Sequence, residues 1–139
     1  MGLFRIRRAV VVGCGDFGSA VAEKLSSVGY SVTAIDKDAS AFNGFASRFG
    51  GEMVLGDGSD VTVLEEHGVR EACLLAACTG EDSINYFVGR IAREVYGTER
   101  VFARIEDEDL IGLLDESTVE PISPHAICLA EFCRAARIS

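Results

Sequence analysis

The chain has 139 residues, enough for one domain with a buried core but too few for two. With 48% hydrophobic and 25% charged residues, its composition is that of a globular protein. The net charge of −9 argues against a nucleic-acid partner, because phosphate-backbone binding needs clustered Lys and Arg. No apolar run approaches the roughly 20 residues of a membrane span, and the start of the chain does not read as a signal peptide. Five cysteines without a CxxC spacing favour a reducing cytoplasm over disulfides or a metal site.

Short apolar runs alternate with segments of helical period along the whole chain. The runs predict six strands, at residues 9–13, 30–36, 52–55, 72–78, 100–105 and 119–122. The other segments predict helices at 16–29, 39–49, 61–67, 83–96, 110–114 and 124–137. The second of these helices rests on an apolar stripe of Phe42, Phe45, Ala46 and Phe49. Together the alternation predicts a single α/β domain over residues 1–139, with a Rossmann-like, doubly wound parallel sheet of six strands.

A glycine-rich loop follows the first predicted strand. It matches the GxGxxG pattern of dinucleotide-binding loops and consists of Gly13, Cys14, Gly15, Asp16, Phe17 and Gly18. We expect Gly13 to make the tight turn, Gly15 to let a pyrophosphate approach the backbone, and Gly18 to let helix and strand pack closely. The N–H groups at the start of the helix would then face the phosphates. The loop predicts a site for NAD(H) or another adenine nucleotide.

Acidic residues indicate which nucleotide the site would take. Asp36 ends the second predicted strand, where a carboxylate accepts hydrogen bonds from ribose hydroxyls and repels a 2′-phosphate. NAD is therefore favoured over NADP, although the neighbouring Lys37 weakens this exclusion. Asp16 stands where phosphates gather, and its charge should disfavour a crowded triphosphate, which favours NAD(H), ADP or AMP over ATP. The alternative for Asp16 is a favourable interaction with the helix dipole.

Loops after the third, fourth and fifth predicted strands should complete the pocket, because ligands of open α/β sheets bind at the carboxyl ends of strands. The candidates are Gly56, Asp57 and Gly58 in the first loop, Cys78, Thr79 and Gly80 in the second, and Arg104 at the end of the fifth strand. The first group would flank an adenine, and the second would bring a hydroxyl and amides near the pyrophosphate. The arginine suits a phosphate or carboxylate. Ordinary turn chemistry or helix capping is the alternative for each.

With these motifs in place, the chain resembles the amino-terminal nucleotide-binding domain of the Trk/Ktr potassium-uptake regulators, also called the RCK, KTN or TrkA-N domain. The matching segments are 12–18, 33–36, 54–58, 77–82 with Asn85, 101–105 and 119–124. The resemblance implies a non-enzymatic cytoplasmic subunit, peripheral to the inner face of the cell membrane, that forms a dimer or ring and gates a separate potassium-translocating membrane protein. It also implies a carboxyl-terminal regulatory domain, which a separate chain would supply. Some members have a basic residue at the position of Asp16, a departure that bears on triphosphate binding.

Two other functions stay open at this point. A small NAD-dependent oxidoreductase domain would need an acid or base beside the nicotinamide, and both histidines, His67 and His125, are predicted to lie away from the pocket. A nucleotide- or redox-sensing module that regulates another transporter would share the fold and the pocket.

The last predicted helix is apolar over a wide arc. Its apolar residues are Ala126, Ile127, Leu129, Ala130, Phe132 and Cys133. The helix either packs on its own sheet or crosses to a second subunit, and the resemblance favours a crossover helix.

Overall fold

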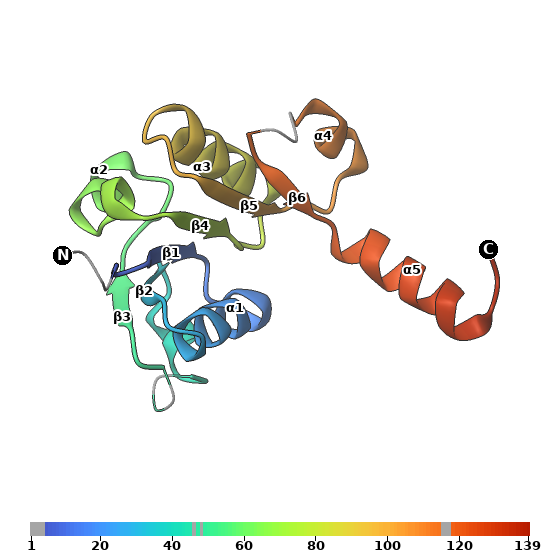
Figure 1. Cartoon of the computed structure of the whole chain (residues 1–139), viewed down its shortest axis with the longest axis horizontal. Helices are drawn as coiled ribbons and strands as arrows, with labels where there is room; N and C mark the ends of the chain where they lie inside the picture. The colour runs from blue at the N-terminus through green and yellow to red at the C-terminus, as the bar shows by residue number, and fades with distance from the viewer. Residues whose placement is uncertain (1–4, 46, 48, 115–117) are drawn as a thin grey trace.

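A parallel sheet of six strands forms the centre of the molecule (Figure 1). The computed structural model describes residues 5–45, 47, 49–114 and 118–139. The strands are β1 (Arg8–Val12), β2 (Ser31–Asp36), β3 (Glu52–Leu55), β4 (Leu74–Ala77), β5 (Arg100–Arg104) and β6 (Glu120–Ile122). They are ordered β3-β2-β1-β4-β5-β6, and every neighbouring pair is parallel. The predicted Rossmann-like, doubly wound sheet is confirmed, with its switch point between β1 and β4.

Helices cover both faces of the sheet, as the side chains of β1 require. Val10 and Val12 belong to a core that includes residues of α2 (Val61–Glu66) and α3 (Asp82–Glu94). Ala9 and Val11 face the other way, into a core shared with α1 (Asp16–Ser27). The 3-10 turn η2 (Val69–Glu71) and helix α4 (Glu108–Leu113) lie on the α3 side. A strand that is apolar on both faces is therefore buried on both faces.

The helix predicted for residues 39–49 is wrong. Among the described residues of this range, only the 3-10 turn η1 (Ala39–Phe42) forms, and turn residues follow it. An interior glycine costs a helix about 1 kcal/mol, and Gly44 follows an asparagine in a pair that favours a turn. The aromatic stripe still reaches the core, because Phe45 and Phe49 are buried with ring centroids 5.1 Å apart. Ala46, also assigned to the stripe, lies outside the described residues.

Helix α5 (Pro124–Ala136) leaves the sheet and extends away from it (Figure 1). The hydroxyl of Ser123 caps its start by accepting a hydrogen bond from the N–H of Ala126 (3.2 Å). None of its residues is buried, and Ile127, Leu129 and Phe132 are 57%, 54% and 61% exposed. Packing of this helix on its own sheet, one of the two sequence-based alternatives, is therefore wrong.

In the part of the chain that the structure describes, no helix is long and apolar enough to cross a bilayer.

Candidate functional site: a cleft at the carboxyl ends of the strands

A cleft of 590 Å³ opens at the carboxyl ends of the central strands, a volume in the range of small-molecule sites. Twelve of the predicted site residues line it: Gly13, Gly15, Asp16, Phe17, Asp36, Lys37, Asp57, Gly58, Cys78, Thr79, Gly80 and Arg104. Three others do not, namely Cys14, Gly18 and Gly56. Seven lining residues were not predicted: Val12, Ile35, Asp38, Ala41, Ser59, Glu81 and Ile84. Five of these seven lie within two positions of a predicted residue, so widening each predicted strand end by two residues would have found them. No sequence signal pointed to Ala41 or Ile84.

Two glycines of the loop are required by packing inside the protein itself. Gly13 has a φ of +93°, and a Cβ there would lie 2.6 Å from the amide nitrogen of Thr79. A Cβ on Gly18 would lie 1.7 Å from the carbonyl oxygen of Gly13. Gly18 therefore stands behind the cleft wall and sets how closely α1 approaches the turn.

Gly15 differs from both, because no described atom lies within 4 Å of the Cβ that a side chain would add there. It is the N-cap of α1, and the first intrahelical bond runs from the N–H of Ser19 to its carbonyl oxygen (2.9 Å). The helix therefore leaves the N–H groups of residues 16–18 unpaired. Asp16 lies exposed in the first turn of the same helix end. Packing within the chain does not require a glycine at position 15. A glycine there would leave room for an anion to approach these N–H groups.

The carboxylate of Asp36 is held in place by the backbone. Its Oδ2 accepts a hydrogen bond from the N–H of Cys14 (2.7 Å), and its Oδ1 accepts one from the N–H of Asp38 (2.8 Å). A carboxylate has about four acceptor positions, so each oxygen keeps one for another donor. Asp36 is therefore fixed at the cleft with capacity for two hydroxyl groups.

The loop after β3 forms the adjoining wall. Asp57 accepts hydrogen bonds from the N–H (2.9 Å) and hydroxyl (2.6 Å) of Ser59, which lower the pKa of its carboxyl group. A Cβ on Gly58 would lie 2.3 Å from Cγ1 of Val12, so this loop lies directly on the end of β1. Gly56 does not line the cleft, and a Cβ there would lie 3.2 Å from Cγ1 of Val63.

The loop after β4 is fixed by Asn85, a fully buried residue of α3. Its Oδ1 accepts hydrogen bonds from the N–H (2.9 Å) and the hydroxyl (2.7 Å) of Thr79. Its Nδ2 donates to the carbonyl oxygens of Thr79 (2.9 Å) and Arg104 (2.8 Å). The hydroxyl proton of Thr79 thus has a partner inside the chain. A Cβ added at Gly80 would have no described atom within 4 Å.

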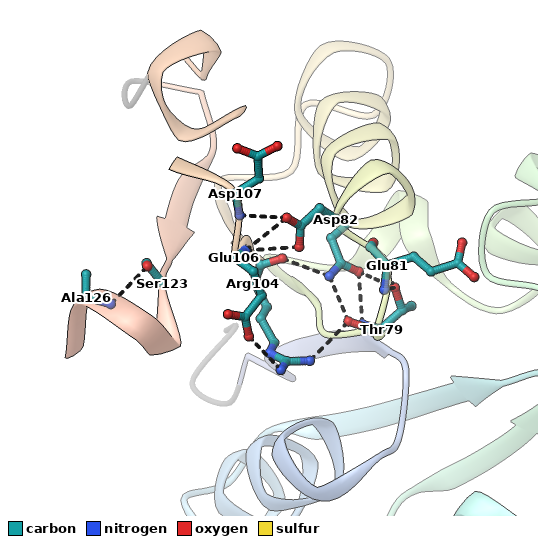
Figure 2. Close-up of polar contacts among 9 residues, drawn as sticks. Thr79, Glu81, Asp82, Arg104, Glu106, Asp107, Ser123 and Ala126 are labelled. Atoms are coloured by element: carbon teal, nitrogen blue, oxygen red, sulfur yellow. Dashed lines mark hydrogen bonds and ion pairs between the residues drawn. The ribbon is translucent and has the colours of Figure 1, made fainter. Parts of the chain in front are cut away.

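Figure 2 shows how the loops after β4 and β5 are joined. The carboxylate of Asp82 accepts hydrogen bonds from the N–H groups of Glu106 (3.0 Å) and Asp107 (2.7 Å). The guanidinium of Arg104 forms an ion pair with Glu106 (2.9 Å) and contacts the carbonyl oxygen of Thr79 (3.4 Å). Arg104 is therefore tied to both loops that border this end of the cleft.

Two buried cysteines lie in or behind the cleft wall. Burial, and secondarily the charge of Asp36, raises the pKa of the Cys14 thiol to about 12. Burial also raises the pKa of the Cys78 thiol to about 12. Both are protonated and unreactive at neutral pH, so they serve as apolar wall material.

A second hollow, here called the groove, lies on the α1 side of the sheet and has a volume of 350 Å³. Val21 and Leu25 of α1 form one side of it. Leu74, Phe102 and Ile122, from β4, β5 and β6, lie among its strand residues. Its lining is mostly apolar, and α1 is the one described helix that contributes residues to it.

The model of the TrkA-N domain family matches residues 9–123, which include the cleft loops and all but the last helix. The chain belongs to the TrkA-N domain family. A TrkA-N relative, the Trk system potassium uptake protein TrkA of Streptomyces coelicolor, is 44% identical over 98 residues. The alignment covers 70% of this chain and 44% of that protein, so the chain spans less than half the length of this curated relative.

Solved structures share the TrkA-N fold. The TrkA-N domain of the inner membrane protein ybaL from Escherichia coli superposes with a TM-score of 0.81 at 17% identity, covering 96% of this chain and 98% of that one. The GsuK channel bound to NAD gives 0.69 at 17% identity, with 89% of this chain and 22% of that chain covered. GsuK bound to ADP gives 0.73 at 22% identity, with coverages of 87% and 31%. At these identities the likeness establishes the fold.

Proposed function

We propose that this TrkA-N domain is the nucleotide-sensing part of a potassium uptake system. It binds NAD(H), or ADP or AMP in its place, and gates a separate potassium-translocating membrane protein from the cytoplasmic side. The observation that carries the proposal is Gly15, whose missing side chain leaves space in front of the unpaired N–H groups of α1. The name of the Streptomyces relative supports the potassium system, and the NAD- and ADP-bound GsuK structures support the ligand class.

Asp36 supports a ligand with two free ribose hydroxyls. Its oxygens already accept N–H groups from Cys14 and Asp38, so its charge and position are set before a ligand arrives. A 2′-phosphate in that place would meet a fixed carboxylate, and NADP should bind weakly. Asp16 adds a second negative charge near the phosphates, which disfavours ATP.

The ligand acts as a regulator and not as a redox cofactor in this proposal. Neither histidine lines the cleft: His67 lies 3.8 Å from Glu52 on β3, and His125 lies in the exposed first turn of α5. Proton transfer beside a nicotinamide would need such a group within hydrogen-bond reach.

Calorimetric titration of the nucleotide-free protein with NADH, NAD, NADP, ATP, ADP and AMP tests the ligand. Micromolar binding of NADH or NAD with at least tenfold weaker NADP is the expected result. Equal binding of NADP and NAD would contradict the role of Asp36, and binding of none would remove the proposal. The gating step is tested by potassium flux through the membrane subunit in the presence of the wild-type chain and of Asp36→Ala, whose flux should no longer respond to NAD.

We also propose that the domain dimerises by exchanging α5. No residue of α5 is buried against the described part of the chain, and none lines the apolar groove. If each copy places α5 in the groove of the other, both apolar surfaces are buried by one symmetric contact. Larger rings, and a separate chain with the carboxyl-terminal regulatory domain, would build on this dimer.

Sedimentation velocity tests the exchange. The wild-type chain should be a dimer at micromolar concentration, and Phe132→Asp, which puts a charge on α5, should be a folded monomer. Phe87→Asp is the matched control, because Phe87 is an exposed phenylalanine of α3 that lines neither the cleft nor the groove. A wild-type chain that stays monomeric with α5 folded would remove the exchange.

A further inference from the structure

The cleft and the groove share part of their walls. Phe17 in the first turn of α1, Cys78 after β4, and Arg104 at the end of β5 line both hollows. A nucleotide in the cleft and a helix in the groove would therefore contact the same side chains from two sides. Both occupants are assigned by the proposed function, on which the coupling of the two sites rests.

Arg104 is the charged member of this shared wall. Its side chain is 29% exposed, and its guanidinium has Glu106 as its ion-pair partner. In the register of β5 and β6, Arg104 faces Ile122, and the next residue, Ser123, caps α5. Figure 2 shows Arg104 between Thr79 of the cleft and the start of α5. One side chain thus borders the cleft, the groove and the root of the exchanged helix.

We propose that Arg104 couples nucleotide binding to docking of α5 from a second copy, so that each strengthens the other. An apolar helix laid over the groove removes water from the guanidinium, and because the side chain of its ion-pair partner Glu106 is itself 49% exposed, the lost hydration needs further compensation. The phosphates of a nucleotide supply that compensation from the cleft side. Because binding linkage is reciprocal, the factor by which the nucleotide strengthens the dimer equals the factor by which the dimer strengthens nucleotide binding.

ADP titrated into the full chain measures the coupling in both directions. Saturating ADP should lower the dimer dissociation constant, measured by sedimentation, by about tenfold, within the usual range for coupled sites. In calorimetry, the monomeric variant Phe132→Asp should bind ADP about tenfold more weakly than the wild type. Phe87→Asp should bind ADP as the wild type does.

Arg104→Gln separates coupling from a merely structural role. On its own and combined with Phe132→Asp, it should give one and the same ADP affinity, because the coupling group is gone. A structural role would lower ADP affinity by an equal factor in both backgrounds and leave their tenfold difference in place, which would overturn the proposal. Thermal denaturation verifies that each variant is folded.

The coupling through Arg104 and the proposed function are contradicted by different results. A chain that binds ADP and dimerises, but whose dimer constant does not fall with ADP, overturns the coupling alone. Absence of nucleotide binding or of dimerisation overturns the proposed function, and the coupling falls with it.

Discussion

The cleft and helix α5 differ in where their side chains find partners. At the cleft, Asp36, Asn85 and Asp82 are each held by hydrogen bonds to backbone groups of the same chain, so these side chains are positioned before any ligand binds. In α5, large apolar side chains such as Leu129 and Phe132 remain more than half exposed. The polar groups of the first region find partners within the chain, whereas the second region presents apolar side chains that no described residue buries.

The largest expected effect is on the free energy of unfolding, when a methyl group added behind the cleft is compared with a larger side chain on α5. Gly18→Ala places a Cβ against the carbonyl oxygen of Gly13, a backbone clash that should cost more than about 3 kcal/mol of unfolding free energy. Ala130→Leu on exposed α5 should change it by less than about 0.5 kcal/mol. Urea denaturation of the two variants at low protein concentration measures both. Equal losses would show that the two regions do not differ in this way.

The reactivity of the cysteines distinguishes the cleft wall from α5 in the unmutated protein. A pKa raised from 9.0 to about 12 lowers the thiolate fraction of Cys14 and Cys78 about a thousandfold near pH 8. Exposed Cys128 of α5 should therefore react with a thiol reagent first, and the two wall cysteines only on unfolding. Mass spectrometry of partly labelled protein identifies the sites, and early labelling of Cys14 would contradict a closed wall.

The pH dependence of stability follows from the same thiols. Their pKa is higher in the folded chain, so folded protein holds these protons more tightly than unfolded protein does. The resulting stabilisation is complete below pH 9 and is lost as the pH rises from 9.0 toward about 12. Denaturation midpoints measured from pH 7 to 11 should fall above pH 9, and Cys78→Ala should make the fall shallower.

Gly15→Ala should lower nucleotide affinity without lowering stability, unlike Gly18→Ala in the same loop. The added methyl group meets open space in the ligand-free protein, so the unfolding free energy should stay within about 0.5 kcal/mol. Affinity for NAD or ADP should fall at least tenfold, equivalent to about 1.4 kcal/mol, because the methyl group occupies the approach to the α1 N–H groups. Unchanged affinity in calorimetry would mean that the phosphates bind elsewhere.

The smallest expected effect concerns Asp16. Replacing this exposed carboxylate by Asn removes one negative charge near the phosphates, and solvent limits the gain to about 1 kcal/mol. ATP affinity should rise a few-fold and more than ADP affinity does. A parallel titration without magnesium measures the ratio, and an unchanged ratio would leave Asp16 with a helix-end role only.

Local sequence patterns predicted the sheet well because each strand leaves its own signal. Short apolar runs located all six strands to within one or two residues, and the glycine spacing located the turn after β1. Packing decides what the motifs do not show: Cys14, Gly18 and Gly56 belong to the motifs but do not line the cleft, and their nucleotide contacts stay a prediction. Residues 39–49 bury their aromatic rings without a helix, which periodicity alone does not reveal.

The sequence does not predict which surface α5 packs against. Its apolar arc predicts burial but carries no information on which surface supplies it, since an intramolecular and an intermolecular contact require the same residues. Nucleotide contacts of the cleft residues stay a prediction, to be tested by titration.

The double anchoring of Asp36 has a consequence for cofactor preference. In Rossmann domains an acidic residue near this position hydrogen-bonds the ribose 2′-hydroxyl of NAD. Here the same carboxylate also holds the N–H of Cys14, inside the glycine turn, and the N–H of Asp38, at the start of the next loop. Removing it to admit a 2′-phosphate would leave both N–H groups without an acceptor and loosen the turn that shapes the phosphate site. Selection for a 2′-phosphorylated ligand would therefore have to rebuild the backbone of this corner, so the proposed preference for a free ribose should resist change by a single substitution.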